Sequence, residues 1–294
     1  MTGVLVTPRR SAVLLGCYQH RLLSTTQVCR LFFGPGYDRR AAQRVLAGLE
    51  AKGLVRRVLG PPPARHALWF ATELGCASAE AAGAPERSYR MTPELAGGAL
   101  QAHTLAVNEV GLAFVEAALA RGDECSPFDW EHEVAHRIAD RPTGGRGSDF
   151  LIADAVLQYT FRRPDGTGAL LQRFVELDRG TMGLLRLGAK LRAYAQLERF
   201  RPRRGRGDAD ADGGWRSRYA TFPKLLVVLT GQGEVARRRT LLDLCVADPR
   251  LHPGRATIDI SVVEFESLLK EGPFAPIFWR PGAPEPVHML GTAA

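Results

Sequence analysis

The second half of the chain is organised around the run Phe174-Val175-Glu176-Leu177-Asp178-Arg179-Gly180-Thr181, in which two acids lie two residues apart among apolar neighbours. Because side chains alternate along a strand, a strand here would present both acids on one face. An upstream run, Leu151-Ile152-Ala153-Asp154-Ala155-Val156-Leu157, carries another acid, and Lys190 follows on an expected helix. Three carboxylates and a lysine suggest a divalent-metal phosphodiesterase.

Composition and charge narrow the class of protein. The chain has 294 residues, 45% of them hydrophobic, which suffices for one large or two modest packed domains. A formal net charge of +8 favours a polyanionic partner. The five cysteines are scattered without a C-x-x-C pair, so neither a disulfide framework nor a cysteine zinc site is predicted. We find no spanning run of about 20 apolar residues and no export signal, so we expect a cytoplasmic protein that does not enter a membrane.

Residues 8–82 predict three helices followed by a basic hairpin. The first helix carries Val13-Leu14-Leu15, the second covers 25–33 with Ser24 as its N-cap, and the third covers about 38–52 and ends at Gly53. Strands over 54–59 and 67–71 then flank a turn rich in glycine and proline. This is the layout of a winged helix-turn-helix.

The third helix of a winged helix usually enters the major groove of DNA, where its exposed side chains reach the base edges. The candidates on this helix are Arg39, Arg40, Gln43 and Arg44. The hairpin adds three arginines that suit phosphate contacts, namely Arg56, Arg57 and Arg65. The alternative is a solvated helix face on a protein-contact domain, but the arginine-rich hairpin favours DNA.

A linker over 83–100 leads to a second domain over 101–275, and a tail covers 276–294. The domain is predicted to contain a helix over 101–120, strands over 128–138, 150–161 and 170–177, a helix over 182–200, a strand over 225–229, a helix over 234–247 and a strand over 257–263. The order helix, three strands, helix, strand is that of restriction-endonuclease-like folds. We therefore predict a mixed α/β chain, a winged helix followed by an αβββαβ domain of the PD-(D/E)XK type.

Restriction-endonuclease-like folds carry an acid on the second strand and Glu-x-Lys on the third. Asp154 and Glu176-Leu177-Asp178 match, with Asp178 standing where lysine is usual. Asp154, Glu176 and Asp178 would hold Mg²⁺ or Mn²⁺, which prefers oxygen ligands and lowers the pKa of a bound water. Lys190 would supply the missing cation. Most basic residues of this chain are arginines, so a lysine at this position suggests a local requirement for lysine. The alternative is a surface lysine whose stem covers apolar neighbours.

The whole chain resembles the replication-relaxation proteins of mobile elements and conjugative plasmids, which are related to the MobC-type relaxases. The matching pieces include the winged helix, Trp130-Glu131-His132-Glu133, the run from Phe174 to Thr181, Lys190-Leu191-Arg192-Ala193-Tyr194 and Pro276-Ile277-Phe278-Trp279-Arg280. The proline that usually precedes the first acid of the family is Ala153 here. The resemblance implies DNA nicking or cleavage in plasmid replication or conjugation. DNA, a second copy of the chain and other replication or transfer proteins are the candidate partners.

Two further residues are candidates for this site. Tyr194 stands one helical turn after Lys190 and could act as the nucleophile of a tyrosine-linked relaxase. Its spacing from Leu191 favours packing in the core instead. Glu131 would approach the metal from the first strand of the second domain.

The run His132-Glu133-Val134-Ala135-His136 fits H-E-x-x-H, the zinc metallopeptidase motif, which requires a helix. The alternation of polar and apolar residues over 128–138 favours a strand. Three functions therefore stay open: a metal-dependent DNA nickase or endonuclease, a non-catalytic DNA-binding regulator that uses the nuclease fold as a scaffold, and a zinc metallopeptidase.

Overall fold

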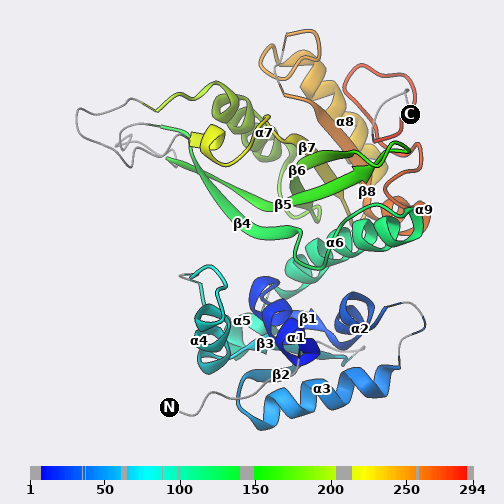
Figure 1. The fold of residues 1–294 in the computed structure, drawn as a ribbon. Helices are drawn as coiled ribbons and strands as arrows, with labels where there is room; N and C mark the ends of the chain where they lie inside the picture. The colour runs from blue at the N-terminus through cyan, green and yellow to red at the C-terminus, as the bar shows by residue number, and fades with distance from the viewer. Residues whose placement is uncertain are drawn as a thin grey trace. The chain divides into compact units, whose positions relative to one another are not determined.

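The chain divides into two compact units in a computed structural model (Figure 1). The model describes residues 8–34, 36, 38–60, 65–87, 89–98, 100–139, 149–202, 214–255 and 258–289. The first unit is Met1–Glu116 with Cys125–Asp129, and the second is Ala117–Glu124 with Trp130–Ala294. We had placed the boundary in a linker over 83–100, whereas by contacts the first unit extends through most of a long helix beyond it.

The first unit begins with three helices, α1 (Pro8–Gln19), α2 (Thr25–Phe33) and α3 (Arg39–Ala51). A short strand, β1 (Leu23–Ser24), precedes α2, and the hairpin of β2 (Val55–Leu59) and β3 (Ala67–Ala71) follows α3. The three strands pair antiparallel in the order β1-β3-β2. This is the predicted arrangement of a winged helix-turn-helix.

Local capping residues define where α2 and α3 begin and end. The Ser24 hydroxyl accepts a hydrogen bond from the Gln27 backbone at 3.1 Å, and the Gln27 side chain accepts one from the Ser24 backbone at 3.0 Å. Asp38 caps α3 by accepting a bond from the Arg40 backbone at 2.8 Å. Gly53 follows α3 with φ +68°, a conformation that glycine adopts without strain.

Three more helices follow in sequence, α4 (Glu73–Ala81), α5 (Pro93–Gly97) and α6 (Gln101–Arg121). We did not predict α5, which lies in the stretch assigned to the linker. Its Thr92 N-cap accepts a bond from the Leu95 backbone at 3.3 Å, and Pro93 stands at its start. None of the described helices combines the length and apolarity that crossing a bilayer would require.

The amino-terminal part of α6 is bonded to the winged helix. The Asn108 side chain donates to the Leu22 carbonyl at 2.8 Å, and the Gln27 side chain donates to the Leu105 carbonyl at 3.0 Å. Arg30 adds ion pairs to two glutamates of α6, Glu109 at 2.6 Å and Glu116 at 2.7 Å. These bonds explain why residues up to Glu116 belong to the first unit.

The described part of the second unit contains a sheet of β4 (Trp130–Arg137), β5 (Phe150–Arg162), β6 (Gly168–Asp178), β7 (Lys224–Leu229) and β8 (Ile260–Glu264), in that order. The first three strands are antiparallel, whereas β7 and β8 run parallel to β6. The helices α7 (Leu184–Arg199) and α8 (Glu234–Ala247) connect the parallel strands, and α9 (Phe265–Glu271) follows β8. The predicted order of helix, three strands, helix and strand is therefore observed.

The helices α7 and α8 bury one face of this sheet (Figure 1). Leu191 of α7 and Leu241 of α8 join one core cluster with Val227 and Leu229 of β7. The register pairs Glu176 with Val227 and Asp178 with Leu229, so both acids face the helix layer. The prediction that the two acids share one face of a strand is confirmed, and that face is the one that α7 and α8 cover.

We predict that Gly75→Ala destabilises the first unit. A Cβ at Gly75 would lie 1.9 Å from the Leu54 carbonyl oxygen, so α4 would have to move away from the backbone that precedes β2. We expect the free energy of unfolding to fall by about 3 kcal/mol in urea denaturation followed by circular dichroism. The matched control is Gly97→Ala, whose Cβ would meet nothing within 4 Å. Equal effects of the two substitutions would contradict the prediction.

Candidate functional site

Asp154 lies where two strand ladders are interrupted. The β4–β5 ladder pairs residues on both sides of this position but skips Glu133 and Asp154 themselves. Glu133 has φ +48°, a conformation that is uncommon for a residue other than glycine. On the other side of β5, the β5–β6 ladder begins at the pair of Ala155 with Val175 and does not include Asp154.

The interruption changes which side chains of β5 face the helices. Leu151, Ala153 and Val156 all belong to the core beneath α7 and α8, so the alternation of β5 shifts by one residue across Asp154. The Asp154 carboxylate itself enters the β5–β6 bonding pattern, because its Oδ2 accepts a bond from the Leu177 backbone at 2.9 Å. The acid is thereby fixed between the two strands.

Asp154, Glu176, Lys190 and Tyr194 form a single hydrogen-bonded cluster from β5, β6 and α7. The Lys190 Nζ donates to Asp154 Oδ1 at 3.1 Å and forms an ion pair with Glu176 Oε2. The Tyr194 hydroxyl donates to the other oxygen, Glu176 Oε1. Lys190 and Tyr194 are four residues apart on α7, so both reach the sheet from the same helix face.

The electrostatics of the cluster follow from its burial. Burial and the Asp154 charge raise the pKa of Glu176 to about 8, although Lys190 and Tyr194 act in the opposite direction. Burial lowers the pKa of Lys190, but the two carboxylates outweigh it and the pKa is raised overall, so the ammonium stays charged. A buried carboxyl whose pKa lies near neutrality can hold or release a proton at physiological pH.

Tyr194 is a fully buried member of the core. Its ring packs 5.1 Å from that of Phe174, measured between centroids, and it belongs to the cluster beneath α7. Burial and the Glu176 charge raise the pKa of its hydroxyl well above the ordinary value. The hydroxyl is therefore a proton donor to Glu176, as the packing interpretation predicts, and is poorly suited to act as a nucleophile.

Asp178, predicted as the third metal ligand, is held by another helix. Its Oδ2 accepts from Arg237 of α8, which also donates to the Met182 carbonyl at 2.8 Å, and its Oδ1 accepts from the Gly180 backbone at 3.1 Å. Within the described residues no three His, Cys, Asp or Glu side chains could hold a metal ion together. In this structure the partners of the three acids are protein cations, Lys190 for Asp154 and Glu176 and Arg237 for Asp178, and the metal site stays a prediction.

The residues of the H-E-x-x-H motif lie on β4, as the alternation predicts. His136 Nε2 lies 2.9 Å from the Tyr219 hydroxyl and its Nδ1 lies 3.1 Å from the Val134 carbonyl, so both ring nitrogens are engaged. Four residues of strand separate the two histidine Cα atoms by about 13 Å, too far for one zinc ion. The metallopeptidase hypothesis is therefore wrong. Glu131, also on β4, pairs with Arg218.

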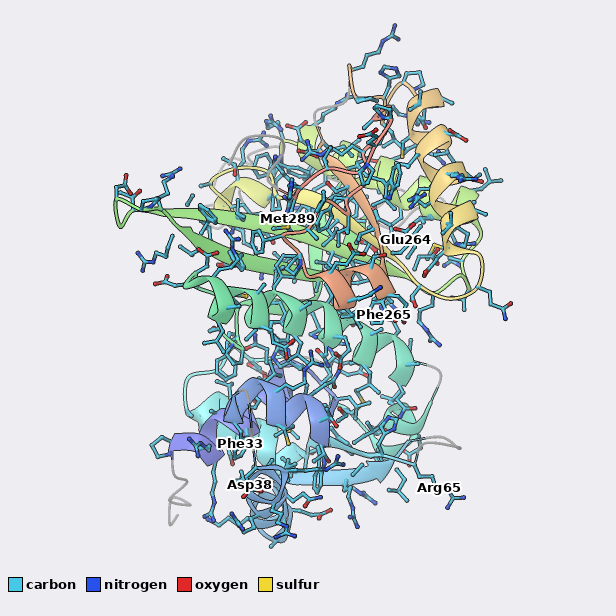
Figure 2. All side chains as sticks on the ribbon, turned by 90° about the vertical axis from the view of Figure 1, so that its right-hand side faces the viewer. Phe33, Asp38, Arg65, Glu264, Phe265 and Met289 are labelled. Atoms are coloured by element: carbon cyan, nitrogen blue, oxygen red, sulfur yellow. The ribbon has the colours of Figure 1, made fainter. Side chains whose placement is uncertain are left out.

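The predicted DNA-contacting residues are all exposed in the first unit. Figure 2 shows one of them, Arg65, with its side chain pointing away from the ribbon. Ala42, Leu46 and Leu49 bury one side of α3. The side chains predicted to contact DNA, Arg39, Arg40, Gln43 and Arg44, are all exposed on this helix. The hairpin arginines are exposed as well, Arg56 and Arg57 on β2 and Arg65 before β3. Residues 61–64 of the wing lie outside the described part of the chain.

Comparisons with known proteins find one family. Its description is replication-relaxation, and it matches residues 15–208. No curated protein matches the chain. A mutant of ZitR from Lactococcus lactis is 18% identical, with a TM-score of 0.23 over 27% of this chain and 51% of ZitR, so the match spans about half of ZitR. A mutant of MarR from E. coli, complexed with operator DNA, is 23% identical, with a TM-score of 0.25 over 40% of this chain and 75% of MarR.

We predict that Glu176 makes stability depend on pH. Its pKa is raised from 4.5 to about 8 on folding, so its contribution to the free energy of unfolding is complete below about pH 4.5 and is lost as the pH rises through about 8. Relative to Glu176→Gln, the wild type should lose up to roughly 4 kcal/mol between about pH 5 and pH 8. Urea denaturation at several pH values measures this difference. The same pH dependence in both proteins would show that Glu176 does not titrate in this range.

Proposed function

Because the chain belongs to the replication-relaxation family, we propose that it binds duplex DNA through its winged helix in the replication or transfer of a plasmid or other mobile element. The observation that carries this proposal is the surface of α3. Its first two turns present three arginines and a glutamine to solvent, while its other side is buried in the unit.

These side chains suit the edges of base pairs. The guanidinium of Arg39 or Arg40 can donate two parallel bonds to guanine, and the amide of Gln43 can pair with adenine. Arg44 lies 3.6 Å from Asp38 in an ion pair whose side chains are 73% and 58% exposed, which is a weak interaction that DNA could replace. The arginines of the hairpin would hold the flanking phosphates and fix the orientation of α3.

A second candidate function is cleavage of one DNA strand at the Asp154, Glu176 and Lys190 cluster. It is favoured by the placement of a carboxyl with a pKa near 8 beside a charged lysine, since such perturbed groups concentrate at functional sites. Lys190 would stabilise the charge of the scissile phosphate and Glu176 would transfer a proton. The sheet order and the α7 and α8 connections support a restriction-endonuclease-like fold for the second unit.

The alternative is a regulator whose second unit performs no chemistry. This alternative is supported by the ion pairs of the three acids that were predicted to bind metal. Lys190 pairs with Asp154 and Glu176, and Arg237 pairs with Asp178. Binding of Mg²⁺ or Mn²⁺ by Asp154 and Glu176 would have to displace the Lys190 ammonium. DNA binding by the first unit is common to both proposals, and cleavage separates them.

We predict that removing two charges from α3 weakens DNA binding. Arg39→Ala combined with Arg40→Ala should lower the affinity for duplex DNA at least about tenfold and reduce its salt dependence, because two basic contacts are lost. Electrophoretic mobility shifts or fluorescence anisotropy at several salt concentrations measure both effects. Arg163→Ala with Arg239→Ala is the matched control, since both residues are exposed in the second unit. A control that weakens binding as much as the α3 variant would show that only net charge matters.

We predict that Asp154→Asn and Lys190→Met each reduce nicking of a supercoiled plasmid by about a hundredfold or more, because the first removes the carboxylate that holds Lys190 and the second removes the ammonium that acts on the phosphate. The assay is run with Mg²⁺ and with Mn²⁺ on DNA that carries the cognate site. Binding of the same DNA should stay within about twofold, since α3 is unchanged.

Asp243→Asn is the control for this assay, because it removes the same charge from the exposed side of α8. Two results would count against cleavage. One is a wild-type protein that binds the site but nicks no substrate, and the other is a nicking activity that survives both variants.

A further inference from the structure

We propose that the second unit also binds the phosphate group of a nucleotide, in a site formed by Arg173, Lys224 and Arg280 around Asp259. The site lies where β7 and β8 begin. Lys224 is the first residue of β7, and the Asp259 carbonyl accepts a bond from the Leu225 backbone at 2.8 Å. The register of β6 is unbroken from Arg173 to Asp178, so Arg173 and Glu176 lie on opposite faces of the sheet. The proposed site is thus separate from the Asp154 cluster.

Arg173 is the buried centre of this site. The residue is 3% exposed, and only its Nη2 has a partner among the described residues, the Met289 carbonyl at 3.0 Å. Its Nε and Nη1 are buried and find no hydrogen-bond partner in the described part of the chain. Burial lowers the pKa of Arg173 to about 10, which leaves the guanidinium charged at neutral pH. A buried charge with two unsatisfied donors is costly, so the geometry indicates an anion that completes the site.

The side chains around Arg173 also carry more positive than negative charge. Lys224 Nζ lies 2.8 Å and Arg280 Nη1 lies 3.9 Å from the same oxygen, Asp259 Oδ2. Arg173 pairs with Lys224 in the register of β6 and β7, so their side chains lie on the same side of the sheet, and Lys224 and Arg280 share Asp259. Three cations against one carboxylate leave a net charge of +2. The Nε of Arg280 is also buried without a partner, so a single acid cannot satisfy the donors that gather here.

A cleft of about 570 Å³ opens at the Asp259 and Arg280 side of this group, and neither Arg173 nor Lys224 belongs to its lining. Asp259 and Arg280 line one part of it, and apolar side chains line the rest, namely Leu251, Pro253, Ile258 and Pro281. This volume lies in the range of small-molecule sites. A nucleotide fits both features, because its base and sugar can cover the apolar wall while its phosphate accepts bonds from Arg280 and lies in the positive field of Arg173 and Lys224. The phosphate could belong to a mononucleotide or to the 5′-phosphorylated end of a DNA strand.

The test compares thymidine 5′-monophosphate with thymidine by isothermal titration calorimetry on the full chain. We expect the monophosphate to bind at least about tenfold more tightly, because only it can accept charge-assisted bonds. Arg280→Gln and Lys224→Gln should each weaken its binding about tenfold or more. Arg255→Gln is the matched control, since this exposed arginine lies on the segment before β8 and does not line the cleft, and it should change the affinity less than about twofold.

A second arm identifies the source of the phosphate. A short single-stranded oligonucleotide with a 5′-phosphate is compared with the same strand ending in a 5′-hydroxyl. Preference for the phosphorylated strand without binding of the mononucleotide would assign the site to a DNA end. Arg173→Met should abolish binding in either arm, and if this variant does not fold, the Arg280 and Lys224 variants decide. Absence of any preference for phosphate, or equal losses in the Arg255 control, would overturn the proposal.

Discussion

The Lys190 ammonium, shared between Asp154 and Glu176, holds together three elements of the second unit. Removing a carboxylate from water costs several kcal/mol, which a close countercharge can offset, and the pKa of Glu176, raised to about 8, reflects the part of this cost that Lys190 does not offset. Lys190 supplies this charge from α7 at 3.1 Å from Asp154 while its side chain is only 23% exposed. The position of α7 over the sheet, the burial of Glu176 and the interruption of β5 therefore depend on one another. Tyr194, one turn further along α7, completes the bonding of Glu176.

Much of the fold could be predicted because the relevant signals are local. The bounds of α2 and α8 agree with the sequence prediction, and Ser24 is the N-cap of α2 as predicted. The alternation over 128–138 identified a strand where a five-residue motif suggested a helix. The choice of Lys190 rested on composition, since lysine is rare in this chain, and the structure places it between Asp154 and Glu176.

The sequence could not reveal contacts between distant segments. Asp178 was expected to join Asp154 and Glu176 in one metal site because it shares a strand face with Glu176. Its partner is instead Arg237, which is 59 residues away in the sequence. The positive φ of Glu133 and the shifted alternation of β5 arise from strand pairing and leave no local pattern. The short helix α5 was missed because its flanking glycines and prolines are typical of a linker. The gathering of Arg173, Lys224 and Arg280 likewise depends on the order of the strands.

Asp154 combines two tasks that most acidic residues keep apart. Its carboxylate neutralises a lysine, and it also occupies a place in the sheet that a backbone carbonyl would ordinarily fill, since it accepts the Leu177 amide. An alanine at this position would leave that amide unsatisfied and loosen the edge between β5 and β6, whatever the reaction. Asparagine can keep the amide bonded while it removes the charge and the acceptor oxygen that faces Lys190. Comparing the two substitutions would therefore divide the effect of Asp154 into an architectural part and an electrostatic part.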